Sequence, residues 1–331
     1  MRTAKRETIL PIVVLVIVIV FIATVSCAPP IRLTAEEFIV TTHPAWQRHP
    51  SISGTIVVWQ DRAAGLSDNI YGYDLADGAE LVISPTPSSK SDPDISGNIV
   101  VWADNRNGNW DIFGYDINTG EEFAICTDPV DQRNPSVDGS IVVWVDERNG
   151  NRDIYGYDLR TGTEFVICDD PDDQDSPDIS GNFIVWADNR NGNWDIYGYD
   201  LLTKSEFQIT HDPANQRYPS VSGSTVVWAD NRNGNWDIFG YDLEIGDEFP
   251  ITTNAAEQQS PVVDENVVVW IDQRRGNWDI YGYDLALRFE FSISTNLAEQ
   301  WHPAISGNTL VWMDKRNGNW DIYGARLAWE H

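Results

Sequence analysis

The sequence predicts an all-β fold, a seven-bladed β-propeller of four-stranded blades whose ring is closed when an N-terminal strand completes the last blade. Three observations predict it: a repeat of about 42 residues, four short strand-like segments in each repeat, and complementary partial repeats at the two ends of the chain. Self-similarity at a period of this length is typical of propellers.

A Trp-x-Asp motif marks the repeat. Its copies are spaced by 43 residues once and by 42 residues thereafter. The seven motif tryptophans are Trp59, Trp102, Trp144, Trp186, Trp228, Trp270 and Trp312. We expect each to end the second strand of a blade and to pack between adjacent sheets, where burial removes roughly 150–250 Å² of each indole from water.

Each repeat contains four short segments rich in β-branched and aromatic residues. In the second copy they are residues 93–96, 99–104, 111–116 and 122–126, separated by Gly, Asn, Asp and Thr. Such segments bounded by turn residues predict antiparallel strands joined by hairpins. Four of them per repeat correspond to one propeller blade.

The two ends of the chain carry complementary parts of one blade. The last copy ends near Leu327 without an outermost strand, and a spare outermost strand, Glu37–Thr41, precedes the first copy. A closed ring in which this strand completes blade 7 removes open sheet edges, whereas an open solenoid leaves both partial blades unexplained. We therefore assign residues 37–331 to the propeller and residues 31–36 to a linker.

Residues 1–30 are predicted to be a signal peptide or a membrane anchor. A basic start precedes Ile9–Val25, a stretch of 17 residues without charge, which fits a signal-peptide core or a marginal membrane span. Cys27 ends a segment that resembles a bacterial lipobox, so it is a candidate lipidation site. Lipoprotein, uncleaved anchor and free secretion stay open, and each places the propeller outside the cytoplasmic membrane, with membrane contact only through this segment.

The charge of the chain is strongly acidic, with 51 acidic and 22 basic residues and a formal net charge of −29. Such a field repels nucleic acid and favours solubility, cations and basic partners. We expect a monomeric propeller that binds no nucleic acid. Cys126 and Cys168 occupy equivalent repeat positions, and we expect them to be buried small residues without a disulfide.

The third strand-like segment carries a family resemblance. Gly192-Asn193-Trp194-Asp195-Ile196-Tyr197 resembles TolB-type propeller repeats and, more closely, the tandem propeller repeats of archaeal and bacterial cell-surface proteins. The resemblance covers about residues 37–328. It implies a propeller fold and an extracellular or cell-surface location, and it implies no single function.

Repetition argues against catalysis by the acidic position that recurs in every copy of the motif. The motif aspartates are Asp61, Asp104, Asp146, Asp188, Asp230, Asp272 and Asp314. A catalytic acid is needed once or twice, so a residue present in every blade indicates a structural bond. The sequence also contains no nucleophile elbow, P-loop or dinucleotide fingerprint. It therefore favours a non-catalytic binding module for a glycan, matrix or envelope-protein partner, with a structural surface-layer spacer as an alternative.

A second set of tryptophans provides candidate ligand-binding residues. They are Trp110, Trp194, Trp236, Trp278 and Trp320, each in the loop between the second and third strands, with Trp301 near the junction of blades 7 and 1. Such rings can stack on sugars or anchor a protein partner. Alternatively, each ring packs on its neighbouring hairpin and stabilises the loop.

The junction of blades 7 and 1 provides a candidate metal site. Its predicted ligands are His49, His302, Gln47 and Gln300. Imidazole and oxygen donors around a funnel can hold a divalent cation; otherwise no cofactor is expected. Oligogalacturonate lyases are similar in having a seven-bladed propeller with manganese held by His and Gln. They use three His ligands, and only His43 or His211 could supply a third here. A metal-dependent polysaccharide lyase or hydrolase is therefore the enzymatic alternative.

Overall fold

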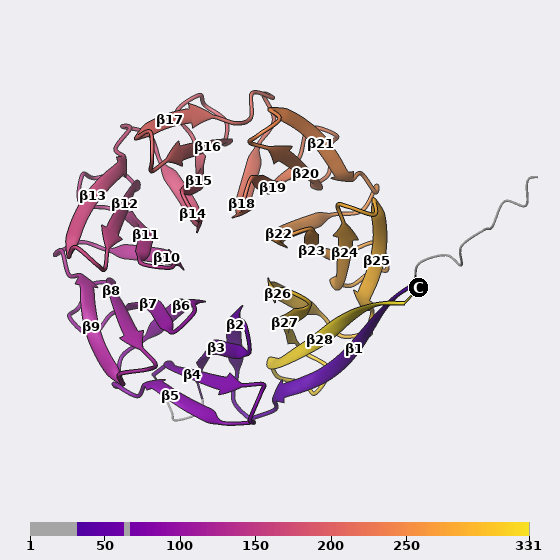
Figure 1. The fold of residues 1–331 in the computed structure, drawn as a ribbon, viewed down its shortest axis with the longest axis horizontal. Coiled ribbons are helices and arrows are strands. Elements are labelled where there is room, and N and C mark those ends of the chain that lie inside the picture. The colour runs from indigo at the N-terminus through magenta and orange to yellow at the C-terminus, as the bar shows by residue number, and fades with distance from the viewer. Residues whose placement is uncertain (1–31, 63–66, 331) are drawn as a thin grey trace, which may run out of the picture.

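The computed structural model describes residues 32–62 and 67–330, so the predicted N-terminal segment and the lipidation site at Cys27 lie outside the described residues. Seven four-stranded antiparallel sheets surround a central axis (Figure 1). The predicted seven-bladed propeller is therefore confirmed. Within the described part of the chain, no helix is long and apolar enough to cross a membrane.

Each blade runs from an innermost strand at the axis to an outermost strand at the rim. Blades 1 and 2 contain β2 (Gln47–Ser53), β3 (Ile56–Asp61), β4 (Asn69–Asp74), β5 (Glu80–Ser84), β6 (Lys90–Ser96), β7 (Ile99–Asp104), β8 (Asp111–Asp116) and β9 (Glu121–Cys126). Blades 3 and 4 contain β10 (Gln132–Asp138), β11 (Ile141–Asp146), β12 (Asp153–Asp158), β13 (Thr163–Cys168), β14 (Gln174–Ser180), β15 (Phe183–Asp188), β16 (Asp195–Asp200) and β17 (Ser205–Gln208).

The remaining blades follow the same order. Blades 5 and 6 contain β18 (Gln216–Ser222), β19 (Thr225–Asp230), β20 (Asp237–Asp242), β21 (Asp247–Thr252), β22 (Gln258–Asp264), β23 (Val267–Asp272), β24 (Asp279–Asp284) and β25 (Phe289–Ser294). Blade 7 contains β26 (Gln300–Ser306), β27 (Thr309–Asp314), β28 (Asp321–Glu330) and β1 (Arg32–Thr41).

The ring closes through β1, which pairs antiparallel with β28. The pairing extends beyond the length of an ordinary outer strand, from Arg32 opposite Glu330 to Thr41 opposite Ile322. Residues 32–36, expected to be a linker, therefore lie in β1. The additional residue pairs between β1 and β28 satisfy backbone groups that a linker would leave exposed to water. In addition, the Trp329 indole donates a hydrogen bond to the Asp284 carboxylate of blade 6 at 2.9 Å.

The core consists of apolar clusters between adjacent blades. Six of the seven motif tryptophans are completely buried, and Trp144 of blade 3, for example, packs with Val101 and Ile112 of blade 2. Its indole N–H donates to Asp146, two residues further along, at 3.0 Å. The motif aspartate is thus a structural acceptor for a buried indole. Cys126 and Cys168 are free and buried, as expected.

In six blades, an arginine two residues after the motif aspartate joins the loop that carries it to the strands of its blade. In blade 3, Arg148 donates to Asp146 and to Glu164, each at 2.6 Å, and its guanidinium lies 4.2 Å from the centre of the Tyr155 ring. The equivalent arginines are Arg106, Arg190, Arg232, Arg274 and Arg316. Charge-assisted hydrogen bonds of this kind offset the cost of burying the aspartate.

The ends of the innermost strands are joined around the axis by a second set of hydrogen bonds. The backbone N–H of Gly97 donates to Ser53 Oγ of the preceding blade at 2.9 Å, and Gly54 donates to Ser306 Oγ across the closure at 3.0 Å. The other donors are Gly139, Gly181, Gly223, Glu265 and Gly307. We call the face with these turns the turn face. The opposite loop face carries the starts of the innermost strands and the loops between second and third strands.

Replacement of Arg148 by alanine should lower the free energy of unfolding by about 3 kcal/mol, because it leaves the buried Asp146 carboxylate without its cation. Urea unfolding measures the difference. The control is Arg160→Ala, which removes a side chain that is 75% exposed and pairs with Asp158 only at 3.4 Å; it should change stability by less than about 0.5 kcal/mol. Equal effects of the two substitutions would contradict the structural role of the arginine.

Candidate functional site

The innermost strands line a channel along the propeller axis. Two cavities of about 510 Å³ and about 350 Å³ occupy it and share wall residues, among them Asp94, Ser136 and Asp178. The smaller cavity lies toward the loop face, because its walls include residues near the starts of the innermost strands, such as His49 and Asn134, whereas the larger cavity reaches their last residues, such as Ser53. The channel therefore provides a concave surface to which all seven blades contribute.

Seven residues form a ring at the loop-face end of this channel, and each directly precedes the proline of its innermost strand. They are His49, Asp92, Asn134, Ser176, Tyr218, Ser260 and His302, which we call the mouth ring. All seven have φ angles between 47° and 54°, a left-handed conformation that costs a non-glycine residue about 1–2 kcal/mol. A register shift accompanies each of them, as between Arg48 and Ser51 in blade 1.

The chemistry of the mouth ring varies from blade to blade, although the proline after it does not. Closure of the ring places blade 7 beside blade 1, so that the rings of His302 and His49 lie 4.5 Å apart between their centres and are tilted by 43°. On its other side, His49 Nδ1 lies 2.7 Å from Asp92 Oδ1 of blade 2. Three titratable side chains thus converge at one edge of the mouth.

Electrostatics fix the charge states of two members of this cluster. Although the His302 side chain is exposed at the mouth, the protein around the channel partly desolvates its imidazolium and the charges of His49 and Arg48 repel it, so the pKa of His302 is lowered to about 4. Burial raises the pKa of Asp92, but the hydrogen bond and positive charge of His49 outweigh it, and the pKa lies below its ordinary value. Asp92 is therefore an ionised acceptor and His302 a neutral imidazole at neutral pH.

The tautomer of His49 follows from the charge of Asp92. An ionised carboxylate only accepts hydrogen bonds, so Nδ1 of His49 carries the proton donated to Asp92. A neutral His49 then has Nε2 as its basic nitrogen. This orientation of an imidazole by a carboxylate is the arrangement that a general base requires.

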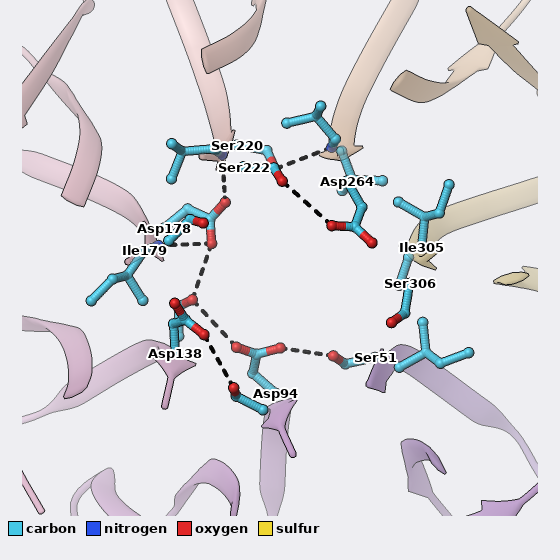
Figure 2. Close-up of a pocket in the computed structure, with 18 of the residues that line it drawn as sticks. Ser51, Asp94, Asp138, Asp178, Ile179, Ser220, Ser222, Asp264, Ile305 and Ser306 are labelled. Atoms are coloured by element: carbon cyan, nitrogen blue, oxygen red, sulfur yellow. Dashed lines mark hydrogen bonds between the residues drawn. The ribbon is translucent and has the colours of Figure 1, made fainter. Parts of the chain in front are cut away.

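Two carboxyl groups, Asp94 and Asp178, lie deeper in the channel (Figure 2). Ser51 donates to Asp94 at 2.7 Å, and the Ser136 hydroxyl lies 3.3 Å from Asp94 and 3.1 Å from Asp178. Burial raises the pKa of Asp94, and burial together with the charge of Asp94 raises the pKa of Asp178 to about 6. This pair holds a proton more tightly than ordinary carboxyl groups do.

The structure brings together the two histidines among the predicted metal ligands. His49 and His302 are brought together, but Gln47 and Gln300 are fully buried, and their side-chain amides donate to the backbone carbonyls of Ala45 and Ala298. Their equivalents in other blades make the same loop contact. Among residues 32–62 and 67–330, no group of three or more His, Cys, Asp or Glu side chains is placed to hold a metal ion.

The two other histidines considered as ligands line separate cavities. His43 lies beside Thr41 and Trp59, in a cavity formed by blades 7 and 1. His211 lies beside Arg232 and Glu248, in a cavity on blades 4 and 5. Neither lines the cavity that contains His49 and His302.

The five loop tryptophans are half-buried, and each packs against an apolar cluster or lies beside a cationic side chain. Trp110 packs on the cluster between blades 2 and 3, its carbonyl accepts a hydrogen bond from the Gln132 backbone at 2.7 Å, and Arg133 lies 4.9 Å from its ring centre. The equivalents are Trp194, Trp236, Trp278 and Trp320. Trp301 packs on Trp278, with ring centres 5.3 Å apart. These contacts stabilise the loops, and ligand binding by the rings stays a prediction.

Asp92 is the functional candidate that the sequence analysis missed. The sequence contains the information needed to identify Asp92, because this residue occupies the same repeat position as His49 and His302, directly before the proline. Comparison of this one position across the seven repeats identifies every residue of the mouth ring.

Replacement of Asp178 by asparagine should stabilise the protein more at pH 7 than at pH 4. The folded-state pKa of Asp178, about 6, exceeds the unfolded value of about 3.9, so the native state binds more protons and loses stability as pH rises between these values. Because asparagine does not ionise, the variant does not lose stability in this way. Its free energy of unfolding relative to wild type should therefore increase by about 1–2 kcal/mol over that pH range.

Urea unfolding at several pH values measures this change. Asp158→Asn serves as the control of opposite sign, because the backbone N–H of Arg160 lowers the pKa of Asp158. A relative stability of Asp178→Asn that stays constant from pH 4 to pH 7 would contradict the electrostatics described for the channel.

Comparison with known proteins identifies the fold. Neither a protein-family model nor a curated protein matches the chain. Among solved structures, an oligogalacturonate lyase from Vibrio parahaemolyticus superposes with a TM-score of 0.68 and 11% identity, covering 89% of this chain and 97% of that chain. The propeller domain of the Trilobed protease from Pyrococcus furiosus gives 0.70 and 13% identity over 86% and 94%. An acylaminoacyl peptidase from Pyrococcus horikoshii gives 0.69 and 14% identity over 86% and 52%.

These similar structures correct one expectation from the sequence. The expected non-catalytic binding module is contradicted, because the similar proteins are enzymes or parts of enzymes. They also support a general seven-bladed propeller, whereas the TolB-type assignment is not confirmed. A second oligogalacturonate lyase with a TM-score of 0.66 is in complex with manganese.

Proposed function

We propose that this chain is an enzyme that cleaves uronate-containing oligosaccharides by β-elimination at the mouth of the axial channel. The observation that carries the proposal is the contact of His49 with Asp92 and with the neutral His302. The extent of similarity supports a lyase over a peptidase. The match covers 97% of the Vibrio lyase chain, but the peptidase match leaves about half of the peptidase chain without a counterpart.

His49 is the proposed general base. Elimination begins with removal of the proton on the carbon next to the uronate carboxylate, and Nε2 of His49 accepts it. Asp92 holds the ring by its Nδ1–H and stabilises the imidazolium that forms. The electrons of the C–H bond form the new C=C bond, and the bond to the glycosidic oxygen breaks. Water or the imidazolium then supplies the proton that the leaving oxygen takes.

His302 and Arg48 stabilise the negative charge that develops on the substrate carboxylate. A neutral imidazole can donate a hydrogen bond from its N–H group, and it keeps that proton at neutral pH. The low pKa of His302 keeps its ring neutral above about pH 4. Arg48 is close enough for its charge to act on His302, and its guanidinium lies 4.3 Å from the centre of the Trp46 ring. A guanidinium pairs with a carboxylate through two parallel hydrogen bonds.

The manganese of the similar lyase is not carried over to this chain. Nδ1 of His49 contacts Asp92, and among residues 32–62 and 67–330 no group of three or more His, Cys, Asp or Glu side chains is placed to hold a metal ion, so the proposal is built on the chain's own residues. The proposed reaction therefore uses Arg48 as its cation.

We further propose that the enzyme acts outside the cytoplasmic membrane. The described chain begins in β1, whose first residues pair with the end of β28, and Trp329 there contacts Asp284 on the turn face. An anchor preceding β1 would therefore leave the mouth, on the opposite face, accessible to polysaccharide. The glycan partner expected from the sequence becomes the proposed substrate.

Incubation of the protein with galacturonate oligomers should release products with a C=C bond conjugated to the carboxylate, which ultraviolet absorbance detects. His49→Ala should lower the rate by about 100-fold or more, because it removes the general base. Asp92→Asn should lower the rate by about tenfold or more, because the ring loses its orientation and its counter-charge. His211→Ala, far from the mouth, serves as the control and should leave the rate unchanged.

Three outcomes would contradict the proposal. They are the absence of unsaturated products from a panel of acidic polysaccharides, full activity of His49→Ala, and new reducing ends without unsaturation. The last of these would indicate hydrolysis at the same mouth rather than elimination.

A further inference from the structure

On the loop face, each residue of the mouth ring is directly preceded by a more peripheral residue, and three of these seven are arginines that stack on tryptophans. Each guanidinium lies between 4.2 and 4.9 Å from the centre of an indole ring. The three are Arg48, Arg133 and Arg217. A guanidinium that places its face on an aromatic ring keeps the N–H donors at its edge for a carboxylate.

Blade 3 shows how a carboxylate completes this arrangement. Asp131 lies two residues before Arg133 and uses its two oxygens separately. Oδ1 accepts a hydrogen bond from the backbone N–H of Trp110 at 2.9 Å, and Oδ2 pairs with Nη2 of Arg133 at 2.7 Å. One side chain therefore fixes the loop with one oxygen and neutralises the stacked guanidinium with the other.

In blade 5 the same position holds an amide, Asn215, in place of the carboxylate. Its Oδ1 keeps the contact with the loop, because it accepts a hydrogen bond from the backbone N–H of Trp194 at 3.1 Å. The second oxygen is replaced by an NH₂ group, which only donates hydrogen bonds. Asn215 therefore cannot pair with Arg217 as Asp131 pairs with Arg133.

Arg217 has no other carboxylate partner within the described chain, and every residue of blades 3 to 6 is described. Among these residues its guanidinium forms no hydrogen bond or ion pair, and it stacks on the Trp194 ring at 4.2 Å. Its side chain is only half-buried. The N–H edge of Arg217 is thus available to a ligand.

We propose that Arg217 binds a second carboxylate of the substrate, in the place that Asp131 takes beside Arg133. This inference rests on the proposed function, in which Arg48 holds the carboxylate next to the bond that breaks. Arg217 donates two parallel hydrogen bonds to the carboxylate of another uronate of the same oligomer. It is a specificity-determining residue that favours longer oligouronates over short ones.

The position of Arg217 allows one ligand to reach both arginines. It directly precedes Tyr218, the mouth-ring residue of blade 5, which is 43% exposed and lines the larger cavity together with His302. Figure 1 shows β18, which carries Arg217, across the axis from β2, which carries Arg48. A ligand held at both arginines therefore extends across the mouth.

The acidic field of the chain restricts where an anion can bind. A net charge of −29 repels anions in general, so an anion is retained only beside a cation that lacks a counter-ion. Arg133 is neutralised by Asp131, whereas Arg217 is not. The contribution of Arg217 should also decrease as ionic strength rises, because salt screens the charges of half-exposed groups.

Isothermal titration calorimetry with di-, tetra- and hexagalacturonate tests the inference in a His49→Ala background, which prevents turnover. We expect affinity to rise with oligomer length. Arg217→Gln should abolish this rise and weaken hexamer binding by at least about tenfold, because charge-assisted hydrogen bonds are lost.

Two further variants separate the charge of Arg217 from its packing. Asn215→Asp keeps the arginine but gives it the internal partner that Arg133 has, so it should weaken hexamer binding as Arg217→Gln does. Arg133→Gln is the matched control, because it removes a guanidinium that stacks on Trp110 but is already paired. It should leave hexamer binding unchanged.

The inference is overturned if Arg217→Gln binds the hexamer as tightly as its parent, if Arg133→Gln weakens binding equally, or if Asn215→Asp retains full affinity. Ultraviolet detection of unsaturated products from the protein with His49 intact measures the proposed function separately. Cleavage with hexamer binding that does not depend on Arg217 would overturn this second site alone. Binding that depends on Arg217 without any cleavage would overturn the lyase activity alone.

Discussion

The pairing of β1 with β28 is the constraint on which the rest of the structure depends. It joins the start of the described chain to its end, and it turns a row of seven sheets into a closed ring. Without it, blade 7 would lack its outermost strand and would expose an edge. Closure also brings His302 of blade 7 beside His49 of blade 1, so the candidate catalytic site exists only in the closed ring.

Repetition and its exceptions divide the molecule into scaffold and sites. The buried Trp–Asp–Arg network and the hydrogen bonds between inner strands recur from blade to blade, and they explain the stability of the ring. The mouth ring keeps its backbone conformation in all seven blades but changes its side chain. At the mouth, a common backbone presents chemistry that the fold itself does not require.

The sequence predicted the fold class and the closure of the ring, because the period, the strand pattern and the two partial blades each constrain the same architecture, but it did not predict that residues 32–36 belong to β1. It also predicted that His49 and His302 meet, since this follows from closure alone. It did not predict Asp92 as their partner, because contact depends on the left-handed backbone and the strand bulge before each proline. The metal-ligand role expected of Gln47 and Gln300 stays a prediction, and the structure adds that their side-chain amides donate hydrogen bonds to loop carbonyls, which the sequence does not show.

The proposed function depends on a small charged cluster within a strongly acidic protein. In the proposed reaction, Arg48 and the neutral His302 hold the substrate carboxylate despite the net charge of −29. The most direct test of this account is a crystal structure of His49→Ala with a bound galacturonate oligomer. The account predicts one sugar at the channel mouth, with its carboxylate on Arg48 and its reactive carbon facing the position of the removed imidazole. A sugar bound only on the loop tryptophans, with none at the mouth, would contradict it.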